Sequence, residues 1–187
     1  MESLDELLLD ADDRMEKATQ FLQQELSGVR TGKASPALVE NIDVEYYGSK
    51  TRLRDLASIS TPEARLIVIN AFDPSSLDAI EKAIHGANLG VTPMNDGKVI
   101  RVPIPELSEE RRKDMLKHAK KMAEEQRVAI RNVRREANDQ IKGLQKNSTI
   151  TEDDRDGGLD DIQKSTDDYI KKIDEMLEVK EKDIMEV

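Results

Sequence analysis

The sequence has no cysteine and no tryptophan, and only 3% of its residues are aromatic. Without cysteine the chain can form neither a disulfide framework nor a thiolate zinc site, and it has no cysteine nucleophile. So few aromatic side chains do not suit a deep ligand pocket, which is usually lined with them. No apolar run approaches the length that a transmembrane helix needs. We therefore expect a soluble protein that can reside in a reducing compartment and does not associate with a membrane.

Targeting signals are also missing. The N-terminal residues MESLDELLLD are acidic where a secretory signal is basic, and they lack the arginines of a transit peptide. We therefore expect a cytoplasmic location.

The signatures of catalysis and nucleotide binding are absent as well. The sequence contains no GxGxxG, no phosphate-binding loop ending in GK[ST] and no GxSxG. Its two histidines, His85 and His118, fall on separate predicted helices and do not have the spacing of a metal pair. The acidic run TEDDRD at 151–156 lacks the alternating ligands of a calcium loop, so helix capping explains it better. We predict a protein that is not an enzyme and uses no metal or cofactor.

Charge is abundant by contrast, since 36% of the residues are charged and the formal net charge is −10. The positive charge is concentrated in one segment. Residues 107–146 hold 12 basic and 7 acidic side chains, whereas residues 1–29 hold 2 and 8 and residues 147–187 hold 6 and 14. Such a composition suits long, solvated helices.

Three segments carry apolar residues at steps of three and four, the pattern of an amphipathic helix. Ser108 and Thr151 are candidate N-caps of the second and third helices, and the second would extend about 57 Å over some 38 residues. Three such helices predict a three-helix bundle. Gly157 and Gly158 each cost about 1 kcal/mol inside a helix, so we expect the regular part of the last helix to begin after them. The apolar positions are Leu4, Leu8, Ala11, Met15, Ala18, Leu22 and Val29; Met115, Ala119, Met122, Ala129, Val133, Ala137, Ile141 and Leu144; and Leu159, Ile162, Thr166, Tyr169, Ile173 and Met176.

Between the first two helices the period changes to that of strands. Ile42, Val44 and Tyr46 alternate with polar residues, and RLIVINAF at 65–72 is an apolar run of strand length. The segment SLDAIEKAIHGAN predicts a short helix, and MNDGKVIRV predicts a turn followed by another strand. The fold class is therefore α+β, with a small β/α/β domain at 31–105 inserted into an elongated bundle formed by 1–30 and 106–187.

The chain passes between these two predicted domains twice. One crossing is RTGKASP at 30–36 and the other is PIP at 103–105. Two short, adjacent linkers predict a hinge. Its residues would be Thr31, Gly32, Lys33, Pro103 and Pro105.

The basic segment contains RVAIRNVRRE at 127–136, with four arginines in ten positions. At 100° per residue these arginines fall within an arc of about 100°, roughly opposite the apolar positions, and Lys113, Lys117 and Lys120 project to the same broad side. Like charges on one helix face repel, and arginine can grip two phosphate oxygens at once, so the pattern favours contact with nucleic acid. The alternative is an idle solvated face. Such a face would interleave carboxylates, but Glu124 is the only acid near its centre. The arginines are Arg127, Arg131, Arg134 and Arg135.

The chain resembles the bacterial ribosome recycling factor family over almost its whole length. The resemblance rests on VRTGKASPALVENIDVEYYGSKTRLRDLASIS at 29–60, EKAIHGANLGVTP at 81–93, IRVPIPELSEERRKDM at 100–115 and VAIRNVRREAND at 128–139. It implies an L-shaped protein with the bundle as one arm and the β/α/β domain as the other.

The resemblance also implies a function. Such a protein binds the post-termination ribosome and, with elongation factor G and GTP, promotes dissociation into subunits and release of mRNA and deacylated tRNA. The bundle would contact rRNA of the large subunit through Arg131, Arg134 and Arg135, with Arg112 and Arg30 as further candidates, while the smaller domain swings about the hinge.

One alternative of another class stays open, a coiled-coil adaptor whose heptads engage partner helices rather than each other. Such a protein would self-associate, whereas a recycling factor of this kind is expected to be a monomer.

Overall fold

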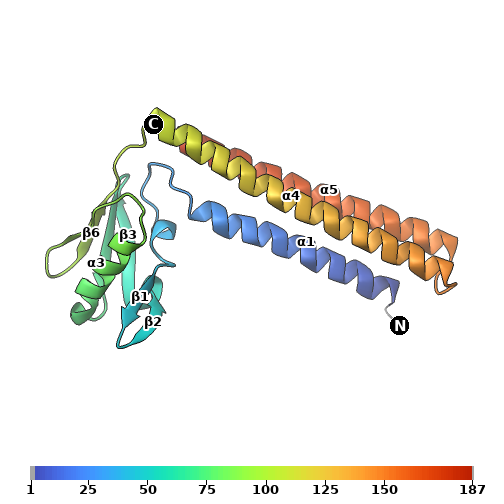
Figure 1. The fold of residues 1–187 in the computed structure, drawn as a ribbon, viewed down its shortest axis with the longest axis horizontal. Coiled ribbons are helices and arrows are strands. Elements are labelled where there is room, and N and C mark those ends of the chain that lie inside the picture. The colour runs from blue at the N-terminus through green and yellow to red at the C-terminus, as the bar shows by residue number, and fades with distance from the viewer. Residues whose placement is uncertain (1–2, 187) are drawn as a thin grey trace. The chain divides into compact units, whose positions relative to one another are not determined.

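The computed structural model of this protein describes residues 3–186 and divides into two compact units. The helical unit comprises the chain up to Leu26 together with Leu116–Asp183, and the mixed unit comprises Ser27–Met115 together with the chain from Ile184. The helical unit is built mostly from three long helices, α1 (Leu4–Ser27), α4 (Glu109–Lys146) and α5 (Glu152–Met185), which lie side by side in Figure 1. The predicted fold class, three long helices with a small inserted sheet domain, is confirmed for the described residues.

Each long helix contacts the other two. Arg14 of α1 donates to Glu136 of α4 over 2.6 Å, and Tyr169 of α5 donates to Asp12 of α1 over 3.1 Å. Arg127 of α4 donates to Asp174 of α5 over 2.6 Å. Isoleucines of α4 and α5 are fully buried, among them Ile130, Ile141, Ile162 and Ile173. The three helices therefore share one hydrophobic core.

The predicted heptad pattern is confirmed in the middle of each helix but is too narrow. Twelve of its positions on the long helices are buried: Ala11, Met15, Leu22, Ala119, Met122, Val133, Ala137, Ile141, Ile162, Thr166, Tyr169 and Ile173. The core also takes Leu7, Thr19, Leu26, Ala123, Ile130 and Leu177, which the pattern omitted. Eight predicted positions are only half-buried, and Val29 is buried but lies beyond the end of α1. The half-buried positions are Leu4, Leu8, Ala18, Met115, Ala129, Leu144, Leu159 and Met176. Each helix of a three-helix bundle faces two neighbours, so its apolar stripe is wider than the two positions per heptad of a simple coiled coil.

Helix α5 begins at Glu152, so the expectation that it starts after Gly157 and Gly158 is wrong. Thr151 and Asp154 form a reciprocal capping pair: the Asp154 backbone N–H donates to Thr151 Oγ1 over 3.1 Å, and the Thr151 N–H donates to Asp154 Oδ2 over 3.0 Å. Gly158 is buried, and a Cβ there would lie 3.0 Å from Leu4 Cδ1. Capping and close helix packing together outweigh the low helix propensity of the two glycines.

Tyr169 gives the bundle a predictable response to alkaline pH. Burial, followed by the hydrogen bond to Asp12, raises the pKa of Tyr169 to about 12 from its ordinary value of 10.0. Because the unfolded chain ionises this tyrosine at lower pH than the folded chain, stability is complete below pH 10 and falls between pH 10 and about 12. We expect Tyr169→Phe to flatten that part of the stability curve measured by urea unfolding, and an unchanged slope would contradict the assignment.

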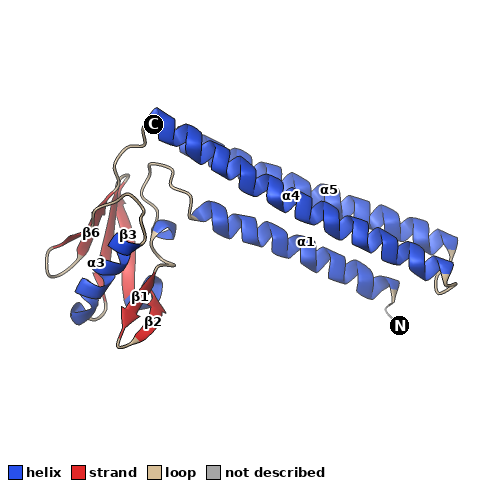
Figure 2. Ribbon diagram, viewed as in Figure 1, coloured by secondary structure: helices blue, strands red, loops and turns tan. Residues whose placement is uncertain are grey.

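The mixed unit contains an antiparallel four-stranded sheet in the order β3-β4-β6-β5 and a separate β1–β2 hairpin (Figure 2). Helix α3 packs against β1, and the core consists of aliphatic side chains from the sheet and α3, with Val44, Ile67, Ile80 and Ile100 fully buried. Its elements are η1 (Pro36–Leu38), β1 (Asp43–Tyr46), β2 (Ser49–Arg52), α2 (Leu53–Leu56), β3 (Ala57–Glu63), β4 (Leu66–Ala71), η2 (Pro74–Ser76), α3 (Leu77–Gly86), β5 (Met94–Asn95) and β6 (Ile100–Pro103).

The apolar elements of this unit agree with the sequence, since the predicted strands correspond to β1, β4 and β6 and the predicted helix to α3. No apolar pattern predicts β3, whose residues ASISTPE are mostly polar. As an edge strand with a register shift between Ser60 and Glu63, β3 has little apolar surface to bury. Its polar composition therefore follows from its position in the sheet.

The predicted domain boundaries at 30/31 and 105/106 fall inside the mixed unit, which also includes the first turns of α4 up to Met115. Ile104 belongs to the core of this unit, and Leu107 is buried. Pro103 is the last residue of β6 and pairs with Leu66, so its assignment to a linker is wrong. The division at residues 30–36 and 105 stays a prediction.

Candidate nucleic-acid interface

Three of the four arginines predicted on α4 extend toward solvent. Arg135 is exposed, and no described residue pairs with its guanidinium. Arg134 is half-buried and its Nη1 donates to Gln163 Oε1 over 3.3 Å. The Arg131 side chain is 38% exposed and its Nη1 donates to Glu124 Oε1 over 3.1 Å. We call Arg131, Arg134 and Arg135 the arginine face.

Arg127 is different, and the prediction that it faces solvent is wrong. Its side chain is only 18% exposed. Its Nε and Nη2 donate to Asp174 Oδ1 over 2.9 and 2.6 Å, and its Nη1 donates to Glu124 Oε2 over 3.0 Å. Asp174 lies on α5, so a projection of α4 alone could not reveal it. Arg127 ties α4 to α5 and has little freedom to bind a phosphate.

Glu124 places a negative charge between two of these arginines. Hydrogen bonds from Arg127 and then Arg131 hold the pKa of Glu124 below its ordinary value, so this exposed carboxylate stays ionised at neutral pH. A phosphate that binds Arg131 must therefore compete with Glu124. Arg134 and Arg135 have no acidic partner within the described residues, and they are the freest cations of the cluster.

The basic stripe toward the start of α4 is thinner than the sequence predicts. Lys113 pairs with Glu109 at 2.9 Å on the same helix, and Lys120 pairs with Glu181 of α5 at 3.3 Å. Lys117 is exposed and has no ion pair in the described part of the chain. The positive surface is therefore centred on residues 131–135.

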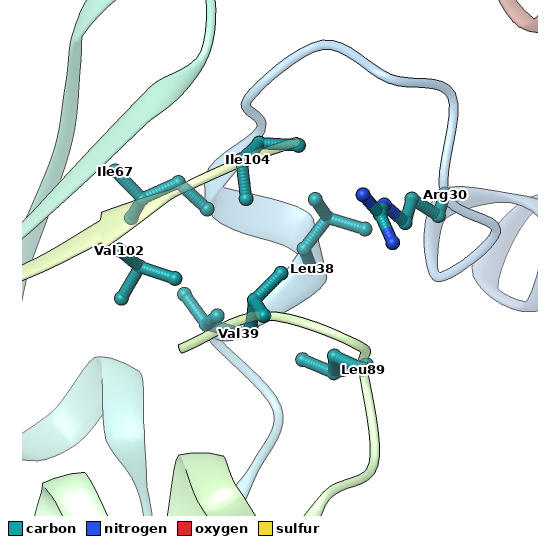
Figure 3. Close-up of a pocket in the computed structure, with 8 residues that line it drawn as sticks. Arg30, Leu38, Val39, Ile67, Leu89, Val102 and Ile104 are labelled. Carbon is teal, nitrogen blue, oxygen red and sulfur yellow. The ribbon is translucent and has the colours of Figure 1, made fainter. Parts of the chain in front are cut away.

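Arg30, a further candidate, already forms a hydrogen bond within the mixed unit. Its Nη2 donates to the carbonyl of Pro105 over 2.7 Å, and its Nε is buried without a hydrogen-bond partner among residues 3–186. Burial, followed by the nearby Arg111, lowers the pKa of Arg30. Figure 3 shows its side chain beside Leu38 at a small apolar cavity of ≈ 20 Å³, which has room for about one water molecule. Arg30 holds the linker to the chain before α4, and the cavity is too small for a ligand.

The remaining predicted residues lie in the same unit. Arg112 is half-buried, and no described residue forms an ion pair with it. Gly32 has φ of 82°, a conformation that favours glycine, and Lys33 forms an ion pair with Glu186. The backbone at Thr31 forms no part of a helix or strand. The hydrogen bond from Arg30 to the Pro105 carbonyl links the chain just before Thr31 to Pro105.

The different roles of Arg127 and the arginine face can be separated by stability measurements. We expect the Arg127→Ala and Asp174→Ala variants to show a coupling free energy of about 1 kcal/mol in a double-mutant cycle, because their ion pair is partly shielded from solvent. Arg135→Ala is the matched control on the same helix and should leave the free energy of unfolding unchanged. A coupling near zero, measured by urea unfolding, would show that Arg127 is free for another partner.

Two features are missing from residues 3–186, a metal site and a helix that could span a membrane. No group of three or more histidine, aspartate or glutamate side chains is arranged there to hold a metal ion. None of the described helices combines the length and the apolar character needed to cross a membrane.

Comparison with known proteins gives one family. Residues 22–185 match the family model described as "Ribosome recycling factor". The ribosome-recycling factor of Halalkalibacterium halodurans is 56% identical over 182 residues, which cover 97% of this chain and 98% of the relative. That of Bacillus subtilis is 52% identical over 182 residues, with the same shares of both chains.

Solved structures agree with this assignment. A solution structure of the ribosome recycling factor matches with a TM-score of 0.83 and 44% identity, covering 100% of both chains. A second match, with a TM-score of 0.71 and 42% identity, covers 98% of this chain and 100% of the other. Its title describes models of the T. thermophilus ribosome recycling factor and the E. coli elongation factor G bound to the E. coli post-termination complex. The family model and relatives that align over nearly their entire length place this chain in the ribosome recycling factor family.

Proposed function

We propose that this protein is a ribosome recycling factor of the cytoplasm. It binds the large subunit of the post-termination ribosome and, with elongation factor G and GTP, promotes dissociation into subunits and release of mRNA and deacylated tRNA. It acts as a translation factor and performs no chemistry, because the elongation factor hydrolyses the GTP. The relative named in the second structural match supports this proposal, since its title places it with elongation factor G on the post-termination complex.

The arginine face is the observation that carries the proposal. In a chain with a formal net charge of −10, Arg134 and Arg135 extend from α4 without an acidic partner among the described residues, next to Arg131. Phosphates of rRNA are ligands that a guanidinium group can bind through two parallel, charge-assisted hydrogen bonds. Acidic residues dominate α1 and α5, so those helices disfavour a polyanion and leave one face of the bundle to bind it.

The proposal is tested by monitoring the splitting of purified post-termination ribosomes with light scattering. With the protein, elongation factor G and GTP all present, we expect rapid loss of scattering from intact ribosomes. Omitting this protein should abolish the loss, and a non-hydrolysable GTP analogue should slow it strongly. Equal rates with and without this protein would exclude the proposed function.

The coiled-coil adaptor is less well supported. The apolar residues that would have to meet partner helices, such as Leu22, Ile130 and Ile173, are fully buried within the bundle. We therefore expect a monomer with a single cooperative unfolding transition. Self-association in sedimentation equilibrium, with loss of helix on dilution, would favour the adaptor instead.

We further propose that the segment around Gly32 acts as a hinge in recycling. Because φ of Gly32 is 82°, proline cannot take its place, and alanine is strained there by roughly 1–2 kcal/mol. A Cβ at this position meets only Leu107, at 3.9 Å, so the effect is on the backbone. We expect Gly32→Ala to slow ribosome splitting several-fold while its affinity for the large subunit changes less than twofold. Equal losses in both assays would remove the case for a hinge.

A further inference from the structure

One aromatic side chain of the helical unit faces solvent. Phe21 of α1 is 53% exposed, whereas Tyr169, the other aromatic residue of this unit, is buried. Leu22 beside it fills the core position at this level of α1. Within residues 3–186, the Phe21 ring packs against no other ring and no cation. Phe21 therefore adds little to the core, and its ring is open to a partner.

The pairing of α1 with α4 shows where this ring lies. The two helices are antiparallel, because α1 ends and α4 begins at the same end of the bundle (Figure 1). Arg14 of α1 bonds to Glu136 of α4 over 2.6 Å. Two helical turns further along α1 is Phe21, and two turns back along α4 is Ala129, so these two residues face each other. Ala129 is half-buried, whereas its neighbour Val128 is 45% exposed.

The surface formed by Phe21 and Val128 continues into the arginine face. Val128 precedes Arg131 by one helical turn and Arg135 by two, so these three side chains lie along one side of α4. Asn132, one turn after Val128 on the side nearer α1, is exposed, and its amide forms no hydrogen bond within the described part of the chain. We call Phe21, Val128 and Asn132 the α1–α4 patch. It adds a ring, an aliphatic side chain and an amide to the neighbouring guanidinium groups.

The composition of the α1–α4 patch suits a base of RNA. Unpaired bases of RNA are bound by stacking on aromatic rings and by hydrogen bonds to their edges, while arginines hold the adjoining phosphates. A protein partner would need a wider apolar surface. Leu9, another exposed apolar residue of α1, lies more than three turns from Phe21 and about 120° around the helix, so it does not widen the patch.

The charges around the ring fix the orientation of such a ligand. Glu25 lies one turn after Phe21, and Glu125 lies one turn before Ala129, and both side chains are exposed. These carboxylates repel a phosphate placed beside the ring, whereas the arginine face attracts it. An uncharged base is not repelled in this way. The phosphates are therefore directed to the arginine face and the base to Phe21.

We propose that the α1–α4 patch binds an unpaired base of large-subunit rRNA, which stacks on the Phe21 ring while the arginine face holds the adjoining phosphates. The Asn132 amide offers both a donor and an acceptor to the edge of the base. Val128 covers the sugar between the base and the phosphates. This inference rests on the proposed function, because it requires that the bundle binds rRNA.

Stacking and phosphate binding are separated by the salt dependence of affinity. We expect Phe21→Ala to weaken binding to purified large subunits about tenfold, and Phe21→Trp to bind at least as tightly as the wild type. The slope of affinity against salt should be the same for all three proteins, because no phosphate contact is lost. Leu9→Ala is the matched control, since Leu9 is 71% exposed on the same helix, and it should bind like the wild type. Wild-type affinity of Phe21→Ala, a shallower slope, or early thermal unfolding of that variant would contradict the proposal.

Photo-crosslinking identifies the ligand directly. A benzophenone amino acid in place of Phe21 is compared with the same substitution at Leu9, each bound to purified large subunits. We expect the probe at position 21 to form an rRNA adduct that stops reverse transcription at one or two neighbouring nucleotides, and the probe at position 9 to yield little. An adduct with a ribosomal protein, no adduct, or equal yields at both positions would overturn the proposal. If the wild type binds large subunits and splits ribosomes in spite of such a result, only this inference fails, whereas a wild type that does neither would exclude the proposed function itself.

Discussion

Replacing Arg131, Arg134 and Arg135 together by alanine is expected to weaken binding to the large ribosomal subunit at least about a hundredfold at moderate salt. Each charge-assisted bond to a phosphate contributes about 1–3 kcal/mol, and 1.4 kcal/mol corresponds to tenfold in affinity. Thermal unfolding should change little, because Arg135 has no partner among the described residues and the other two side chains make only long or exposed contacts. Affinity measured by sedimentation with purified large subunits checks the first effect, and circular dichroism checks the second.

The control removes positive charge from the same helix but away from the arginine face. Lys142 and Lys146 are exposed near the end of α4, and their double alanine variant should bind within about twofold of the wild type. If the triple arginine variant unfolds early, these arginines are structural and the proposed interface is wrong. The same conclusion follows if the lysine variant loses as much affinity as the arginine variant.

The second large effect concerns the neighbouring glycines of α5. Gly158→Val should lower the free energy of unfolding by roughly 2–3 kcal/mol, because its Cβ would lie 3.0 Å from Leu4 Cδ1 and 3.4 Å from Ile141 Cδ1. Gly157→Ala is the matched control, because a Cβ there meets nothing within 4 Å. Alanine at that position should raise stability by up to about 1 kcal/mol through helix propensity.

Urea unfolding of the two glycine variants measures both effects on the same scale. Changes of opposite sign in the free energy of unfolding for these two adjacent positions would confirm that α5 is helical through this stretch and packs against α1 and α4 at Gly158. If both substitutions stabilise the protein, the helices do not approach each other closely there.

Local pattern was enough to predict much of this fold. The repeat of apolar residues predicted α1, α4 and α5, and the candidate cap at Thr151 predicted a helix start that its bonds with Asp154 confirm. This cap favours a start of α5 at residue 152, whereas the low helix propensity of Gly157 and Gly158 favours a later start, which is wrong. Helix propensity is a property of single residues, whereas the stabilisation at Gly158 comes from close packing against α1 and α4, which are distant in sequence.

The candidate interface was predicted less completely for a related reason. A helical projection of α4 gathers the arginines correctly, but it cannot show which of them meet another helix. Asp174 neutralises Arg127 from 47 residues away, and Gln163 reaches Arg134 from 29 residues away. Arg30 is held by the Pro105 carbonyl, 75 residues away, and a backbone acceptor leaves no signal in the sequence.

The salt dependence of binding to the large subunit tests the central claim most directly. For the wild type we expect the logarithm of the association constant to fall with the logarithm of salt concentration, with a slope of roughly −0.7 to −0.9 for each phosphate contact. The variant that lacks Arg131, Arg134 and Arg135 should have a slope shallower by about 2 to 3. Identical slopes for the two proteins would contradict the claim that these three guanidinium groups hold the bundle on rRNA.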